Sequence, residues 1–203
     1  MTTVISRRER KKDETRVRLI AAALDLLSAH GIDAVTVDQI AEAADVGKGT
    51  VYNYFRAKED MVVAFMVDLE RRVQARIARM PASKRSLEAI LADVIRYQFR
   101  LKRRYHAFVR VFLTQMVARM AEFGPYMAEM QKAIDPTLET LFRTLQQRGL
   151  IRADASIAEL CVVFKTVHMG LTMLWAIEGP PFRSMERVLR SEIHFFCKGL
   201  EPR

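Results

Sequence analysis

The segment from residue 36 to residue 55 constrains the fold of this chain most, because it reads as two short helices joined by a tight turn. Thr36 can cap the first helix, with Gln39 at the third helical position reaching back to it in a capping box. Ile40, Ala41 and Ala44 then form a narrow apolar seam, whose small alanines let another helix come close. The first helix is therefore expected to be short and closely packed.

A turn at Asp45, Val46 and Gly47 leads into a second predicted helix, residues 48–55. Two short helices joined by three or four residues that include a glycine are typical of a helix-turn-helix. In that motif the N-terminal residues of the second helix face base edges in the major groove of DNA. The segment therefore predicts a DNA-binding unit.

The same glycines could instead belong to the phosphate-binding loop of a nucleotide-hydrolysing enzyme. Gly47 and Lys48 fit that pattern, but the earlier glycine position holds Glu42 and the hydroxyl position holds Gly49. Residues 36–45 also have the pattern of a helix, whereas such a loop follows a strand. The phosphate-binding loop is excluded.

Further helices are predicted on both sides of this segment. Upstream, apolar residues recur at the spacing of one helix face between Ile20 and Leu27, and Gly31 can end that helix in a left-handed conformation. Downstream, a long helix is predicted from about Lys58 to Met80, with acidic residues in its first turn.

A set of residues across these helices follows one ungapped order: Ile20-Ala21-Ala22-Ala23-Leu24, Gly31, Thr36-Val37, Ile40-Ala41, Val46, Lys48-Gly49-Thr50-Val51-Tyr52-x-Tyr54-Phe55 and Lys58-Glu59. With this order, the run from about Thr15 to Val62 resembles the DNA-binding domain of the TetR family of transcriptional regulators. Two positions depart from the family pattern. Gly47 stands where a serine cap is frequent, and Ala57 replaces a usual cap residue, each at a cost of about 1 kcal/mol of local capping.

The resemblance implies which residues contact DNA. Carried over by position, the residues expected to face bases are Lys48, Gly49, Thr50 and Asn53, and those expected to hold phosphates are Thr36, Tyr52, Tyr54 and Lys58. Hydroxyls and lysines suit phosphate oxygens, and lysine or asparagine can read guanine or adenine edges. Core packing is the alternative for the tyrosines, although Val51 and Phe55 fit that role better.

The charge of the chain is unevenly distributed. The formal net charge is +9, yet residues 1–60 hold ten basic and ten acidic residues. The basic residues of this part concentrate in residues 1–14 and just beyond, for which a flexible arm before the first helix is predicted. Such an arm could follow the minor groove or the phosphates, or it could be a solvated terminus.

Beyond residue 60 the chain is expected to be helical throughout, so the predicted fold class is all-α. The expected division is an arm over residues 1–14, a helix-turn-helix DNA-binding domain over 15–60, and a helical ligand-binding and dimerisation domain over 61–203. The resemblance implies a homodimer whose interface is formed by the last two helices, here about residues 157–178 and 184–200. Trp175, Phe195 and Phe196 are candidates for that interface or for the core.

The resemblance also implies a small-molecule pocket between the intervening helices. The candidate lining residues are Phe65, Tyr97, Arg100, Phe108, Phe112, Met116, Phe142, His168 and Met169. Arg100 could meet an anionic group of the ligand, although most of the basic residues between 71 and 110 are expected to lie on a solvated face. His168 lies on an apolar helix, where a satisfied core histidine is the more frequent outcome.

The sequence contains no motif that is typical of an enzyme, a metalloprotein, or a secreted or membrane protein. The four histidines lie far apart, neither a metal-binding motif nor a nucleophile elbow occurs, and we expect no metal, cofactor or catalytic residues. No signal peptide or membrane span is expected, and Cys161 and Cys197 read as reduced thiols of a cytoplasmic protein.

The prediction is a ligand-responsive repressor that binds a palindromic double-stranded DNA operator as a homodimer and is released by a small apolar or amphipathic effector. The alternative from another class is an enzyme or carrier of apolar anionic small molecules that retains a vestigial DNA-binding head.

Overall fold

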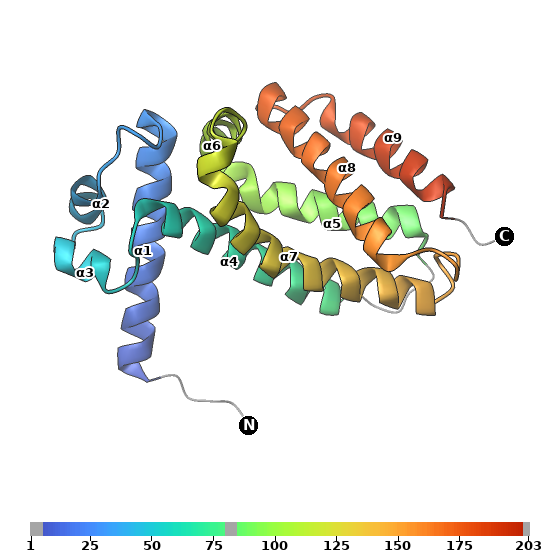
Figure 1. Cartoon of the computed structure of the whole chain (residues 1–203), viewed down its shortest axis with the longest axis horizontal. Coiled ribbons are helices and arrows are strands. Elements are labelled where there is room, and N and C mark those ends of the chain that lie inside the picture. The colour runs from blue at the N-terminus through green and yellow to red at the C-terminus, as the bar shows by residue number, and fades with distance from the viewer. Residues whose placement is uncertain (1–5, 80–84, 201–203) are drawn as a thin grey trace. The chain divides into compact units, whose positions relative to one another are not determined.

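The computed structural model describes residues 6–79 and 85–200 of the 203-residue chain. All regular secondary structure in these two ranges is helical, which confirms the predicted all-α class (Figure 1). The helices are α1 (Arg7–His30), α2 (Val37–Ala43), α3 (Lys48–Tyr52), α4 (Lys58–Ala78), α5 (Leu87–Lys102), the short 3-10 helix η1 (Arg103–Tyr105), α6 (His106–Ala118), α7 (Met120–Gln147), α8 (Ile157–Glu178) and α9 (Met185–Lys198).

The contacts divide the chain into two compact units. The first, here called the head unit, contains the residues up to Met66 together with Ala107–Tyr126, and the second, the body unit, contains Val67–His106 and the chain from Met127 onward. The sequence analysis divided the chain after residues 14 and 60. The structure instead adds most of α6 and the start of α7 to the head unit.

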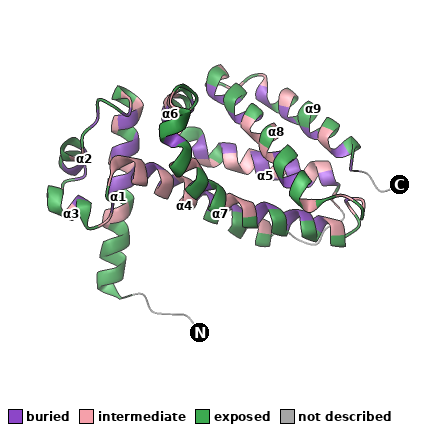
Figure 2. Ribbon diagram, in the orientation of Figure 1, coloured by how far each residue is buried: buried purple, intermediate pink, exposed green. Residues whose placement is uncertain are grey.

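The N-terminal basic segment is helical from Arg7, which corrects the prediction of a flexible arm for residues 7–14; residues 1–5 of the predicted arm lie outside the described part. Ser6 caps α1, because its side chain accepts a hydrogen bond from the Glu9 amide at 3.1 Å and Glu9 Oε2 accepts one from the Ser6 amide at 2.9 Å. This is a capping box that the sequence analysis missed. The first turns of α1 are exposed on all sides (Figure 2).

The head unit is built on the apolar face of α1. Leu19, Ala23 and Leu24 are fully buried, and Leu27 is 1 % exposed. Gly31 ends the helix at a φ of 80°, and its amide donates to the Leu27 carbonyl at 3.0 Å. A side chain would strain this left-handed backbone, so glycine suits the position.

The body unit packs an aromatic and aliphatic core between α5, α7, α8 and α9. Phe142 of α7 is fully buried, and its ring meets that of Phe164 from α8 at a centroid distance of 5.5 Å. Trp175 of α8 stacks between Phe99 and Phe182, with centroids 5.5 and 5.1 Å away. Trp175 is therefore a core residue rather than part of an exposed surface.

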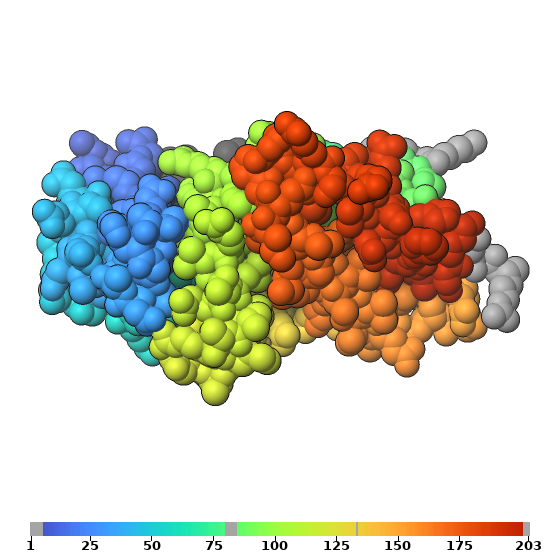
Figure 3. Space-filling model, turned by 90° about the horizontal axis from the view of Figure 1, so that it is seen from above, coloured from blue at the N-terminus to red at the C-terminus, as the bar shows by residue number. Residues whose placement is uncertain are grey.

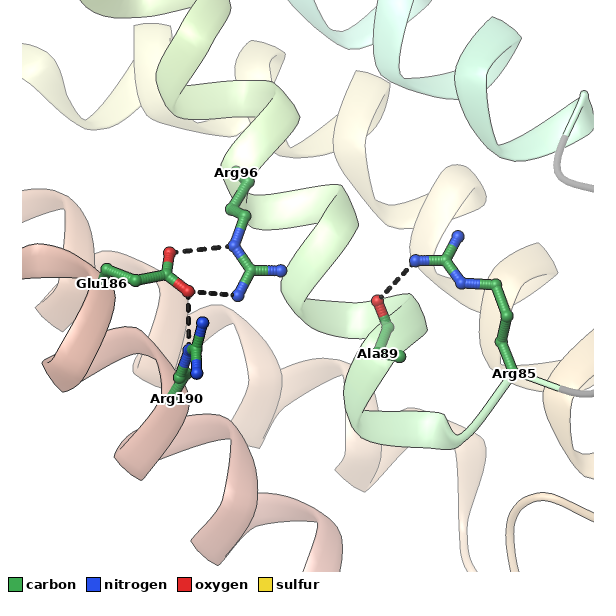
Figure 4. Close-up of polar contacts among 5 residues, drawn as sticks. All are labelled: Arg85, Ala89, Arg96, Glu186 and Arg190. Carbon is green, nitrogen blue, oxygen red and sulfur yellow. Dashed lines mark hydrogen bonds and ion pairs between the residues drawn. The ribbon is translucent and has the colours of Figure 1, made fainter.

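A surface ion-pair network joins α5 to α9 on the outside of this core (Figure 4). Arg96 donates two hydrogen bonds to the Glu186 carboxylate, at 2.9 and 2.5 Å, and Arg190 donates a third at 2.7 Å. The Arg96 guanidinium lowers the pKa of Glu186 to about 2. Such partly exposed pairs contribute at most about 1 kcal/mol each, so they fix the register of the two helices more than they stabilise the unit.

Candidate nucleic-acid interface and buried polar cluster

The capping box predicted at the start of α2 is present. The Gln39 amide donates to Thr36 Oγ1 at 3.3 Å, and the Thr36 amide donates to Gln39 Oε1 at 2.8 Å. These bonds satisfy amides that the first helical turn leaves without partners. Thr36 is exposed, so the same hydroxyl that caps α2 also faces solvent at this edge of the head unit.

The turn between α2 and α3 is a Schellman-type helix ending. The Val46 amide donates to the Ala41 carbonyl and the Asp45 amide to the Glu42 carbonyl, both at 3.0 Å. Asp45 holds the left-handed position with a φ of 52°, where glycine is the usual residue. The predicted turn at residues 45–47 is confirmed, and the bonds explain how so short a link reverses the chain.

Helix α3 is shorter than predicted, since it ends at Tyr52 rather than at residue 55. Gly47 occupies its N-cap without a side-chain hydrogen bond, as the sequence indicated. Val51 is fully buried and Phe55 is 6 % exposed, which confirms both as core residues. These two side chains anchor α3 and turn its remaining residues outward.

The outward face of α3 is polar and accessible. Lys48, Gly49, Tyr52 and Asn53 are exposed, with Tyr52 at 51 %, whereas Thr50 and Tyr54 are half-buried. No heavy atom lies within 4 Å of the position that a Cβ would take at Gly49, so a partner molecule can approach the backbone there. Asn53 is the residue that caps the C-terminus of α3.

Two of the predicted DNA-contacting lysines have partners within the head unit. Lys48 Nζ lies 2.8 Å from Asp38 Oδ2, and this hydrogen bond raises the pKa of the Lys48 ammonium. Lys58 Nζ donates to the Val35 carbonyl at 2.7 Å. The Lys48 contact is exposed, where a lysine exchanges partners at little cost, whereas the Lys58 contact is half-buried.

The missing cap residue before α4 is compensated by a side chain inside the helix. Asp60 Oδ2 accepts hydrogen bonds from the Arg56 and Ala57 amides, at 3.0 and 3.1 Å. The predicted loss of capping at Ala57 is therefore offset, and α4 begins firmly one residue after it.

Residues 107–126 extend the head unit beyond the helix-turn-helix. Arg119 lies at the junction of α6 and α7 and pairs with Asp33 at 2.5 Å and with Glu122. The sequence analysis missed this arginine, because nothing local marks it.

Four of the predicted pocket residues, Phe65, Phe108, Phe112 and Met116, belong to the head unit. The three phenylalanines are buried in its core: Phe65 meets Phe108 edge to face at a centroid distance of 6.0 Å, and Phe108 stacks on Phe112 at 5.8 Å. Met116 is half-buried.

The other five predicted pocket residues, Tyr97, Arg100, Phe142, His168 and Met169, belong to the body unit. Arg100 is exposed and lies over the Tyr97 ring at 5.7 Å, with Arg76 at 5.8 Å from the same ring. Phe142 is core, while His168 and Met169 are half-buried. The buried basic residue of α5 is not Arg100 but Lys102, only 8 % exposed.

Lys102 belongs to a set of polar side chains, here called the buried polar cluster: Glu70 of α4, Lys102 of α5, Thr137 of α7 and the half-buried His168 of α8. The exposed Gln74 of α4 lies at its edge. Gln74 Nε2 donates to Thr137 Oγ1 at 2.5 Å. Burial raises the pKa of Glu70 and lowers that of Lys102 to about 8. The pKa of His168 falls to about 3, through burial and then through the nearby Lys102 charge.

An apolar stripe of α8 is left exposed. Val162, Met173 and Ile177 lie on one helix face, 60, 38 and 74 % exposed, and Gly170 between them leaves room for a close neighbour. Phe195 of the adjacent α9 is 72 % exposed. In Figure 3 these two helices form the orange and red part of the face shown. Large exposed apolar surfaces mark interaction sites.

The same helix is the one element, within the described ranges, that is long and apolar enough to cross a membrane by length and composition alone. Its apolar window is 39 % buried inside the structure. Core helices of globular proteins pass the same test, so this property gives weak evidence. Among the described residues, no three His, Cys, Asp or Glu side chains are grouped so that they could hold a metal ion.

The N-terminal part of the chain matches a known protein family. Residues 19–65 match the family model described as "Bacterial regulatory proteins, tetR family". The HTH-type transcriptional regulator TcmR of Streptomyces glaucescens is 35% identical over 83 residues, which is 41% of this chain and 37% of that protein. The HTH-type transcriptional regulator BetI of Cronobacter sakazakii is 26% identical over 169 residues, 82% of each chain.

Among solved structures, the chain is similar to the transcriptional regulator FadR from Bacillus subtilis in complex with stearoyl-CoA. The TM-score is 0.71 at 21% sequence identity, over 91% of this chain and 99% of that one. At 21% identity, this similarity shows only a shared fold, and the aligned 91% of the chain includes residues of both units.

Proposed function

We propose, from the match of residues 19–65 to the tetR family model and from the regulators that the chain resembles, that this chain is a ligand-responsive repressor of that family, which binds a palindromic operator as a homodimer. The observation that carries the proposal is the outward polar face of α3. Val51 and Phe55 hold this helix in the head unit, while Lys48, Gly49 and Asn53 remain accessible. A helix presented in this way can enter the major groove of DNA.

The proposed contacts divide into two roles. Lys48, Gly49, Thr50 and Asn53 face bases, while Thr36, Tyr52, Tyr54 and Lys58 hold phosphates. Lys48 exchanges its Asp38 partner for a base edge or a phosphate oxygen when DNA is bound, which the exposure of both side chains supports. The Thr36 hydroxyl already interacts with the first turn of α2, and a phosphate would add a charge-assisted bond there.

The proposed dimer forms through the apolar stripe of α8 together with the exposed face of α9. A two-fold axis places the same surface of both copies against each other. The stripe is apolar along most of the helix and contains Gly170, so two copies of α8 can pack closely. Two heads in one dimer would then dock about 34–36 Å apart, or at a multiple of that spacing.

The proposed effector is an amphipathic acyl compound, and its binding releases the operator. The Bacillus subtilis structure that shares this fold holds stearoyl-CoA, which supports an acyl ligand for this chain. Helix α4 runs unbroken from the head unit into the body unit over 21 residues, roughly 30 Å at 1.5 Å per residue. We infer that effector binding in the body unit moves the head through this helix to a spacing that no longer fits the groove.

The proposal assigns the chain no catalytic role and places it in the cytoplasm, where bacterial operators are accessible. The alternative function is that of an enzyme or carrier of apolar anionic small molecules, in which the DNA-binding head no longer has a role. The two differ in one measurable property: only a regulator binds a defined duplex with high affinity.

The experiment selects operator duplexes from a random pool with the purified protein and measures their affinity by fluorescence anisotropy. A palindromic duplex that is bound at least about a thousandfold more tightly than its scrambled version is expected. Dodecanoate and dodecanoyl-CoA are then titrated into the complex. Equal affinity for operator and scrambled DNA would contradict the proposal. Failure of both acyl probes to release the operator would contradict the proposed acyl effector.

A further inference from the structure

The buried polar cluster is unusual because Lys102 forms no ion pair and His168 Nε2 has no hydrogen-bond partner among the described residues. Lys102 is only 8 % exposed, and within the described ranges no carboxylate oxygen lies within 4.0 Å of its ammonium. His168 Nε2 is buried, also without a partner among the described residues. Gln98, one turn before Lys102 on α5, has a buried Oε1 in the same condition. Such groups cost free energy unless something pairs with them.

Another polar group of the cluster, the Thr137 hydroxyl, does have a hydrogen-bond partner. Gln74 Nε2 donates to the Thr137 hydroxyl, so one hydrogen bond joins α4 to α7. Glu70 and Lys102 interact through their charges but form no ion pair, since they lie beyond contact distance. The cluster therefore contains one buried cation with unused hydrogen-bonding capacity.

The surroundings of the cluster are apolar. One helical turn from its members lie Val73, Phe99, Leu141 and Phe164, all buried. A molecule that reaches the cluster must pass between such side chains, so its remaining part has to be apolar as well. A single cation, with Glu70 nearby, matches a compact anion of one negative charge better than a phosphate of two.

We propose that the buried polar cluster binds the carboxylate of an apolar acid, with Lys102 supplying the opposite charge and His168 donating a hydrogen bond from Nε2. The inference rests on the proposed function, because it names the head-group site and the chemical class of the effector. Glu70 has the opposite role, since its negative charge disfavours the incoming anion. Lys102 and Glu70 are therefore expected to affect acid binding in opposite directions.

The test uses the full chain without DNA and measures binding by titration calorimetry. The probes are dodecanoate, its uncharged analogue dodecanol, and dodecanoyl-CoA. Lys102→Met is expected to weaken dodecanoate binding at least about tenfold, as loss of a charge-assisted bond implies, and to leave dodecanol binding nearly unchanged. Glu70→Gln keeps the size of the side chain and removes its negative charge, and it is expected to tighten dodecanoate binding severalfold. Arg100→Met is the matched control, because Arg100 is exposed on the same helix, and it should change neither.

Thermal unfolding followed by circular dichroism checks that each variant is folded. If Lys102→Met does not fold, Glu70→Gln decides alone, since a merely structural Glu70 would not tighten acid binding when neutralised. The inference is overturned if wild-type protein does not bind dodecanoate, if Lys102→Met binds it as tightly as wild type, or if Glu70→Gln weakens it. It is also overturned if dodecanoyl-CoA alone binds and is insensitive to Lys102. Binding of dodecanoyl-CoA that is insensitive to Lys102 would contradict the acid site but not the proposed repressor. Conversely, the absence of a defined operator would contradict the proposed repressor but not the acid site.

Discussion

Replacing Ile177 by glutamate tests the proposed dimer most directly. Ile177 is 74 % exposed at the surface of α8, so the change leaves the core of a single chain undisturbed. Full burial of an isoleucine is worth about 1.5–3 kcal/mol, and burying the exposed part in an interface is worth about 1–2 kcal/mol. A two-fold axis doubles the effect, because each dimer contains two copies of the residue.

The expected loss is therefore about 2–4 kcal/mol from the apolar contact alone, and the desolvation of two glutamates adds to it. Since about 1.4 kcal/mol corresponds to tenfold in affinity, the dimer should weaken by at least about a hundredfold. Sedimentation equilibrium over the nanomolar to micromolar range measures the change. Val17→Glu is the control, because Val17 is a 60 % exposed apolar residue of α1 that lies outside the stripe.

The reasoning is refuted if Ile177→Glu and Val17→Glu have the same dimer affinity, or if the wild-type protein is a monomer both free and on DNA. A weakened dimer should also bind the operator more weakly and with a steeper dependence on protein concentration. If operator affinity stays unchanged while the dimer dissociates, the head units do not need this interface to dock.

Substitutions at four further positions probe the helix-turn-helix. Asp45→Gly should stabilise the chain by up to about 1 kcal/mol, because Asp45 has a φ of 52° and glycine has no left-handed penalty; Asp45→Ala should do the opposite, and denaturant unfolding measures both. Gly47→Ser should add the missing cap of α3 and gain a few tenths of a kcal/mol, which a higher unfolding midpoint would reveal and an unchanged or lower one would contradict. Tyr52→Phe should weaken all duplexes alike, whereas Asn53→Ala should relax the preference at one base pair by about 1–3 kcal/mol; a change of preferred sequence with Tyr52→Phe would show that Tyr52 reads a base.

Much of the head unit was predictable from short stretches of sequence. The Thr36 and Gln39 cap, the glycine at residue 31 and the burial of Val51 and Phe55 all depend on groups within a few residues of one another. Such hydrogen bonds and helical spacings join residues that are close in the sequence, so they can be predicted without knowledge of long-range contacts. The Ser6 and Glu9 cap was equally local and went unnoticed, because a run of basic residues suggested an unstructured arm.

The body unit was predictable in kind but not in detail. Its apolar helices indicated a helical core and a partner-binding surface, yet the sequence could not say which face of α8 is covered. Trp175, Phe195 and Phe196 were equivalent candidates by composition. Packing of Phe99 and Phe182 against Trp175 places that residue in the core, while Phe195 remains 72 % exposed.

The clearest contrast is between Arg100 and Lys102. By itself, the sequence determined an all-helical chain with a helix-turn-helix and its core residues, because those features follow from local caps, turns and helical periodicity. Only the tertiary structure decided that Arg100 faces solvent, that Lys102 is buried near Glu70 and His168, and that Arg119 reaches Asp33. The rotation of a helix about its axis is set jointly by all the side chains packed around it, so the burial of any one charge is a property of the assembled unit.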